Sequence, residues 1–182
     1  MTLHNLIFLK SFQKSLIIGL FLPGFLYADN DFLTPVEPSS KIVAHYLQIK
    51  NPDKSSIFIC YNYGCKTNSI IHISSKNIDS LQEIFQVSDY TAHHERIAIA
   101  QAIARLEQIA AGQTPVYNDK AENMNDKHLP GSMDCIDSTI NTSHYLEFLY
   151  QMDVIKHHLI QQPAYRSSFI FGQHWSALVS TN

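Results

Sequence analysis

The residues with the clearest potential for chemistry surround a cysteine in the second half of the chain. They lie in the run Met-Asp-Cys-Ile-Asp, residues 133–137, where a long polar stretch gives way to an apolar helical pattern. Asp134 is a suitable helix N-cap, and Asp137, three residues later, stands where the partner in a capping box belongs. Cys135 is therefore expected in the first helical turn, where free backbone N–H groups and the helix dipole favour a thiolate.

A nucleophilic cysteine also needs a base and hydrogen-bond donors for an oxyanion. The N–H groups of residues 135–136 are the candidate donors. His174 is the candidate base, because it opens a predicted strand and points away from the face that buries Trp175. The carboxylates of Asp134 and Asp137 oppose this chemistry, because negative neighbours raise the pKa of a thiol. The alternative roles are a packed or disulfide-bonded Cys135 and an ordinary strand histidine at position 174.

Two further cysteines lie close together as Cys60-Tyr-Asn-Tyr-Gly-Cys65, where a turn at Gly64 would bring them within reach of each other. A Cys60–Cys65 disulfide would leave Cys135 as a free thiol. Two alternatives remain open at this point: all three cysteines are reduced, or Cys135 pairs with one of the other two.

No metal site or cofactor is predicted, although the chain has ten histidines. The adjacent pairs His93-His94 and His157-His158 would diverge by about 100° on a helix and cannot easily clamp one ion. His94-Glu95 lacks the second histidine of a zinc-protease helix, and no Cys-x-x-Cys spacing occurs. These histidines are interpreted as solvated, and Glu95 and Arg96 as a structural pair on the polar side of a helix.

The elements that must position these residues follow from hydrophobic periodicity and turn residues. The longest is a helix over Thr91–Ala111, capped at Ser88 or Thr91 and stopped by Gly112. The other predicted elements are a short helix or strand over Lys41–Lys50, a hairpin of Ser56–Tyr61 with Ser69–Ser74, a helix over Ile78–Gln86 capped near Ser75 or Asn77, a surface loop over Gln113–Pro130, a helix from Cys135 to near Val154, and a hairpin of Phe169–Phe171 with His174–Val179 turning at Gly172-Gln173. Together they predict an α+β fold, with two main helices packed on a small antiparallel sheet.

The N-terminal segment has the three parts of a secretory signal. Lys10 and Lys14 precede an apolar run over Leu16–Leu26, and no acidic residue occurs before Asp29. Cleavage is expected after Ala28, which divides the chain into a signal peptide (1–28), a flexible lead-in (29–40) and a single domain (41–182). The alternative is a retained membrane anchor, but a span needs about 20 apolar residues in a row and this run is shorter.

Composition and charge narrow the class of partner. Removal of residues 1–28 takes away two lysines and no acidic residue, so the net charge moves from −3 to −5. An acidic domain without a basic stripe argues against nucleic acid as a partner. The expected partner is a peptide or protein substrate, with cell-wall peptides among those that an exported enzyme meets, and the membrane is met only during export.

The order of a cysteine at a helix start and a histidine at a strand start is similar to papain-like and transglutaminase-like cysteine enzymes. The chain also resembles an uncharacterised family of exported proteobacterial proteins with an Asp-Cys-Ile-Asp motif, over roughly Cys60–Val179. The motifs that carry this resemblance are Met133–Ser138, Asn141-Thr142, Tyr145-Leu146, Glu95-Arg96, Ala102-Ile103, Pro163, Arg166 and His174-Trp175. That family typically continues to a further strand with an Asp, so the resemblance implies a C-terminally short chain.

The function expected from these residues is an exported, thiol-dependent hydrolase or acyl transferase acting on amide bonds, inactive if the chain is truncated. The alternative is a non-catalytic periplasmic binding or structural domain with a Cys60–Cys65 disulfide. In both cases the protein is expected to be periplasmic or secreted.

Overall fold

The computed structural model describes residues 39–86, 90–120, 129–168 and 172–182; the predicted signal peptide and the lead-in up to residue 38 lie outside them. Within these residues the fold is α+β, as the sequence predicted. The elements in chain order are α1 (Ser39–Leu47), β1 (Ser56–Tyr61), β2 (Thr67–His72), α2 (Ser75–Ile84), α3 (Ala92–Ala111), the 3-10 helix η1 (Pro115–Asn118), α4 (Cys135–Gln151), β3 (His158–Ser168) and β4 (Gly172–Thr181).

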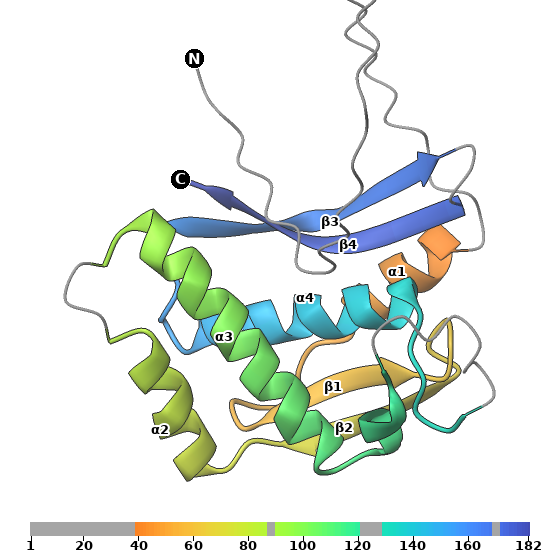
Figure 1. Cartoon of the computed structure of the whole chain (residues 1–182), viewed down its shortest axis with the longest axis horizontal. Helices are drawn as coiled ribbons and strands as arrows, with labels where there is room; N and C mark the ends of the chain where they lie inside the picture. Colours follow the sequence, from red (N-terminus) through yellow and green to blue (C-terminus); the bar gives the residue numbers. More distant parts are fainter. Residues whose placement is uncertain (1–38, 87–89, 121–128, 169–171) are drawn as a thin grey trace, which may run out of the picture.

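Helix α4 is the centre of the arrangement (Figure 1). It runs between the β3–β4 hairpin and the β1–β2 hairpin, while α3 crosses beside it and α2 lies at the edge. The described strands therefore form two separate two-stranded sheets, and the prediction of one small sheet was wrong in this respect. The reason is that each hairpin buries its apolar face against α4, which keeps the two sheets apart.

The first hairpin pairs β1 with β2 in antiparallel register, from Ser56 opposite His72 to Tyr61 opposite Thr67. Every residue of β1 is buried, because one face of the strand packs on the main core and the other faces α1 and α4. The second strand begins at Thr67, two residues before the predicted start at Ser69. Its exposed outer face explains the weak apolar signal there.

The second hairpin differs from the predicted one in its first strand and in its turn. Strand β3 covers His158–Ser168, which the sequence did not identify, and Gly172 is the first residue of β4, opposite Ser168. Gly172-Gln173 is therefore not the hairpin turn, and the predicted partner strand, residues 169–171, lies outside the described residues. Pro163 concealed β3, but it sits at a register shift between Gln161 and Ala164, where a sheet tolerates proline.

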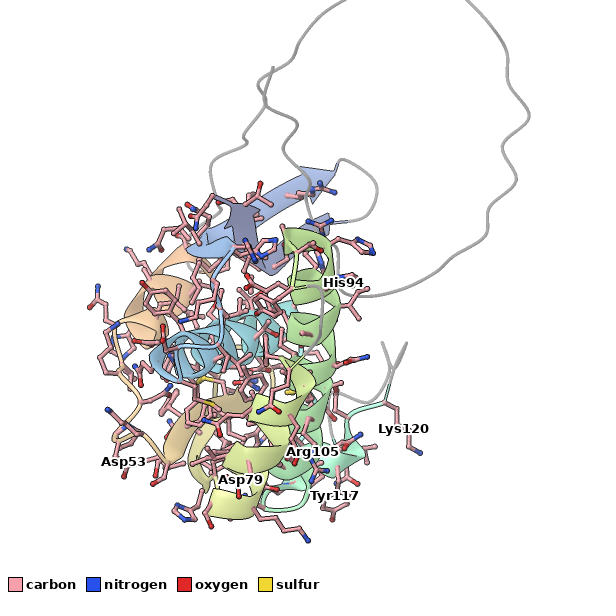
Figure 2. The ribbon with its side chains drawn as sticks, turned by 90° about the vertical axis from the view of Figure 1, so that its left-hand side faces the viewer. Asp53, Asp79, His94, Arg105, Tyr117 and Lys120 are labelled. Carbon is pink, nitrogen blue, oxygen red and sulfur yellow. A yellow bond between two sulfur atoms is a disulfide. The ribbon has the colours of Figure 1, made fainter. Side chains whose placement is uncertain are left out.

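The helices were predicted with mixed accuracy. The prediction for α3 is confirmed: Thr91 is its N-cap, accepting the His94 N–H, and Gly112 its C-cap. Helix α2 begins earlier than predicted, because Ser74 is the N-cap. Residues Ser39–Leu47 form a helix rather than a strand. Arg105, labelled in Figure 2, lies on the side of α3 next to α2. Its guanidinium donates to Asn77 of α2 at 3.4 Å.

The main core joins both hairpins to the helices. It combines Ile57 and Ile71 from the first hairpin, Leu106 from α3, Phe148 from α4 and Val179 from β4. Smaller apolar clusters lie on either side of the first turn of α4. In the described part of the chain, no helix has the length and apolar character that a bilayer span requires.

Candidate thiol site at the start of helix α4

Cys135 is the first residue of α4, and its position is set by a capping box. The Asp134 carboxylate accepts the N–H groups of Ile136 at 3.0 Å and Asp137 at 2.9 Å. In return, the Asp134 N–H donates to Asp137 Oδ2 at 3.1 Å. This capping corrects the predicted oxyanion site, because the Ile136 N–H already donates to the Asp134 carboxylate.

The Cys135 side chain faces the second hairpin. It is partly buried and packs with Ile136 against a cluster of Val43, Tyr165 and Trp175. Trp175 is anchored there, because its indole N–H donates to Ser39 Oγ of α1 at 3.3 Å. Helix α1, the first turn of α4 and the centre of the β3–β4 hairpin thus meet at this cysteine.

The environment favours the protonated thiol. Burial raises the pKa of Cys135 above its usual value, and the carboxylates of Asp134 and Asp137 raise it further. A hydrogen bond from the main chain of Trp175 acts in the opposite direction but does not outweigh burial. The thiol is therefore mostly un-ionised at neutral pH in this arrangement, and nucleophilic chemistry would require an imidazole.

His174 directly precedes Trp175 on β4 and lies opposite Arg166 of β3. Side chains alternate along a strand, so the imidazole leaves the hairpin on the face opposite to Trp175, as the sequence predicted. Both His174 and Arg166 are exposed, whereas Trp175 and Tyr165 are buried. The structure thus brings the main chain next to His174 to the sulfur, while the imidazole points to solvent.

Asp137 faces the opposite side of α4, toward the first hairpin, and is fully buried. Its Oδ1 accepts the Cys65 N–H at 2.6 Å, in addition to the bond from Asp134 to Oδ2. Burial, reinforced by the charge of Asp134, raises the pKa of this carboxyl to about 7. Asp137 therefore joins α4 to the β1–β2 connection as well as capping the helix.

Cys60 and Cys65 form the predicted disulfide, with Cα atoms 4.7 Å apart, and Cys135 is not disulfide-bonded. One buried polar cluster of described residues has the composition of a metal site, since the two sulfurs and a carboxylate oxygen of Asp137 lie within 4.8 Å of one another. With the sulfurs joined to each other, neither is a thiolate, which is the form of cysteine that binds metals.

A second buried polar cluster was missed by the sequence interpretation. Glu95, assigned to the solvated side of α3, is fully buried. Its carboxylate accepts the N–H of Lys156 at 2.6 Å and of His157 at 2.9 Å, and it pairs with His158 Nδ1 at 2.7 Å. Although burial alone would raise it, these hydrogen bonds hold the pKa of Glu95 below its usual value.

This cluster fastens the start of α3 to the start of β3. It also corrects the interpretation of His158 as solvated, since His158 is buried and its Nε2 has no hydrogen-bond partner among the described residues. The place of Glu95 in the first turn of α3 could be recognised from the sequence, because a negative charge there interacts favourably with the helix dipole. Nothing in the sequence linked Glu95 to residues about 60 positions later.

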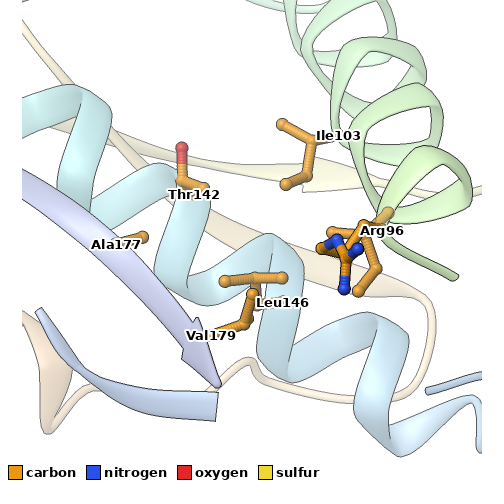
Figure 3. Close-up of a pocket in the computed structure, with 7 residues that line it drawn as sticks. Arg96, Ile103, Thr142, Leu146, Ala177 and Val179 are labelled. Carbon is orange, nitrogen blue, oxygen red and sulfur yellow. The ribbon is translucent and has the colours of Figure 1, made fainter. Parts of the chain in front are cut away.

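Two small pockets lie away from the thiol. The one in Figure 3 lies between α3, α4 and β4, holds about 20 Å³ and is lined by Arg96 and apolar side chains such as Ile103 and Leu146. The other, about 240 Å³, lies beside His144 of α4 and Pro163 of β3. Neither is lined by Cys135, and both are smaller than the 300–1,000 Å³ typical of ligand sites.

Comparison of the chain with protein-family models, with curated proteins and with solved structures finds no match in any of the three.

Proposed function

We propose that this protein is an exported, thiol-dependent hydrolase or acyl transferase that acts on amide bonds, with Cys135 as nucleophile and His174 as general base. The observation that carries the proposal is the meeting of two distant segments. Cys135 occupies the first turn of α4, and its sulfur interacts with the main chain of Trp175, the residue after His174. About 40 positions separate these residues in the sequence.

The proposed reaction has two stages. The Cys135 thiol gives its proton to His174, and the thiolate attacks the amide carbonyl carbon; the C–N bond then breaks and the imidazolium protonates the departing amine. Water or a second amine next attacks the thioester and releases the enzyme, which makes the protein a hydrolase or a transferase. The His174 side chain has to turn from the outer face of the hairpin to reach the sulfur, which makes β4 the element that must move.

The proposed substrate is a peptide or protein met after export, in the periplasm or outside the cell, with cell-wall peptides as one class. The net charge of −3 disfavours nucleic acid. The Asp134 carboxylate, next to Cys135 in the chain, also disfavours acidic groups next to the scissile bond, because like charges repel.

Alkylation of the native protein by iodoacetamide tests the proposal, because Cys135 is the cysteine outside the disulfide. With His174 acting on the thiol, alkylation is expected near neutral pH and should slow by about tenfold or more in His174→Ala. His93→Ala is the matched control, since His93 is an exposed histidine on α3. The Cys-His pair would be ruled out if the labelling rate had the pH dependence of an ordinary thiol and was unchanged in His174→Ala.

A second candidate is a non-catalytic exported domain for binding or structure, held by the Cys60–Cys65 disulfide. Two observations favour it. Burial raises the pKa of Cys135, and the Ile136 N–H donates to the Asp134 carboxylate instead of being available for an oxyanion. In that case Cys135 is a packing residue, and Cys135→Ala should leave every function of the protein intact while Cys60→Ser with Cys65→Ser should not.

A further inference from the structure

The disulfide-bonded loop, residues 60–65, lies against the segment that leads into α4. The Asn62 N–H donates to the Ser132 carbonyl oxygen at 2.8 Å. The Gly131 N–H in turn donates to Asn62 Oδ1 at 2.8 Å. The main chain just before the capping box is thus held by the loop that the disulfide closes.

Two buried side chains of α4 complete this connection, and each binds the main chain of one half-cystine. Asp137 Oδ1 accepts the Cys65 N–H at 2.6 Å. One turn later, Asn141 accepts the Cys60 N–H at 2.6 Å and donates to the Cys60 carbonyl oxygen at 2.8 Å. Since buried hydrogen bonds of this kind are costly to leave unmade, the loop and the first turns of α4 form one unit.

The loop itself holds an unfavourable backbone conformation. Four consecutive residues have left-handed φ values: 69° at Asn62, 62° at Tyr63, 70° at Gly64 and 57° at Cys65. Glycine and asparagine tolerate this region, but tyrosine and cysteine do so only where the surroundings hold them. The disulfide spans this run and restrains it, so breaking the bond allows the loop to relax.

We infer that the Cys60–Cys65 disulfide controls the reactivity of the Cys135 thiol through Asp137 and Asn141. With the disulfide intact, the loop holds the first turn of α4 and keeps Cys135 partly buried. With the disulfide reduced, the loop relaxes, Cys65 withdraws its N–H from Asp137, the capping box loosens and Cys135 becomes accessible. This inference rests on the proposed function, because it concerns regulation of the same thiol.

The switching reaction is thiol–disulfide exchange with an external dithiol. The dithiol gives two electrons and two protons, becomes a disulfide itself, and leaves Cys60 and Cys65 as thiols. A carboxyl oxygen of Asp137 lies within 4.8 Å of both sulfurs. Because the pKa of this carboxyl is raised to about 7, it can protonate the departing thiolate near neutral pH.

The test compares oxidised protein, protein reduced with a phosphine, and the double variant Cys60→Ser with Cys65→Ser. Iodoacetamide labelling of Cys135 at pH 7.5, resolved by peptide mass spectrometry, is expected to rise about fivefold or more in both disulfide-free forms. Amide hydrogen exchange should rise over residues 131–137, while α3 keeps its protection. Protected α3 amides show that the domain is still folded.

Asp137→Ala tests the route, because it removes the oxygen that accepts the Cys65 N–H. In the oxidised protein it should raise Cys135 labelling, and in the double-serine background it should add little, because the two changes break the same connection. Asp79→Ala is the matched control, since Asp79 is an exposed aspartate on α2 and its loss should change nothing in either background.

Unchanged Cys135 labelling after loss of the disulfide would overturn the inference. So would a rise in labelling with equal loss of protection in α3, because the disulfide would then support the whole fold rather than this site. Fully additive effects of Asp137→Ala and loss of the disulfide would overturn the route through Asp137. These outcomes are separate from the proposed function, whose failure appears as unchanged labelling in His174→Ala.

Discussion

At the scale of single residues, Gly131 has little freedom to change. Its φ is +89°, and a Cβ built there would lie 1.9 Å from the Pro115 carbonyl oxygen. The close approach joins η1 to the segment that enters α4. Both the backbone conformation and the contact therefore require glycine.

Gly131→Ala is expected to lower the free energy of unfolding by about 3 kcal/mol or more, measured by urea denaturation. Gly112→Ala is the matched control, because Gly112 has a right-handed conformation and its nearest neighbour to an added Cβ is 3.5 Å away. It should change stability by less than about 1 kcal/mol. Equal effects of the two substitutions would contradict this account of Gly131.

Asp137 predicts a dependence of stability on pH. Its pKa is about 7 in the folded protein, compared with about 3.9 in an unfolded chain. The folded state thus favours the protonated carboxyl, so this contribution to stability is complete below about pH 4 and is lost as the pH rises to about 7.

The free energy of unfolding of the parent protein, relative to Asp137→Asn, should therefore fall by on the order of 4 kcal/mol between pH 4 and pH 8. Urea denaturation at fixed pH values measures this. Asp79→Asn should show no such trend, because Asp79 is exposed to solvent on α2. A pH-independent difference for Asp137→Asn would show that burial does not raise its pKa.

At the scale of elements, the buried Glu95 carboxylate joins α3 to the start of β3. Hydrogen bonds hold its pKa below the usual value, so its stabilisation is present above about pH 4 and is lost as the pH falls through the folded-state pKa. Glu95→Gln keeps one acceptor oxygen but removes the charge that His158 faces.

We expect Glu95→Gln to lower the free energy of unfolding at pH 7 by about 2 kcal/mol, and to flatten the loss of stability in acid. Thermal unfolding followed by circular dichroism between pH 2 and pH 7 is the measurement. Glu83→Gln on the exposed surface of α2 is the control and should stay within about 0.5 kcal/mol of the parent. If the parent and Glu95→Gln lost the same stability between pH 7 and pH 2, this role of Glu95 would be contradicted.

At the scale of the whole molecule, α4 is the element through which the two hairpins are connected. It packs against β1 on one side and against β4 on the other, and the main core runs through it. Since neither two-stranded hairpin is stable alone in water, the domain should unfold as one unit.

Phe148→Ala in the centre of α4 should therefore lower the stability of both hairpins together, by about 3–5 kcal/mol. Hydrogen exchange should show equal loss of protection in β1 and β4. Tyr150→Ala is the control, because Tyr150 lies on the same helix but is 56% exposed. Loss of protection in only one hairpin would show that the two halves unfold separately.

The sequence alone determined the capping box of Asp134 and Asp137, whose members are three positions apart. It narrowed the cap of α3 to Ser88 or Thr91, and it offered the Cys60–Cys65 pairing as one of three alternatives. Such local interactions have few competing partners, so residue type and spacing reduce them to one or a few candidates.

Only the tertiary structure decided how these pieces meet. It placed β3 opposite β4, buried Glu95 against residues some 60 positions away, and turned the first turn of α4 so that Cys135 meets Trp175 and Asp137 meets Cys65. The physical reason is that burial depends on which apolar faces stack, and burial then sets the energies of the polar groups. The raised pKa of the Cys135 thiol, on which its chemistry depends, is therefore a property of the folded chain.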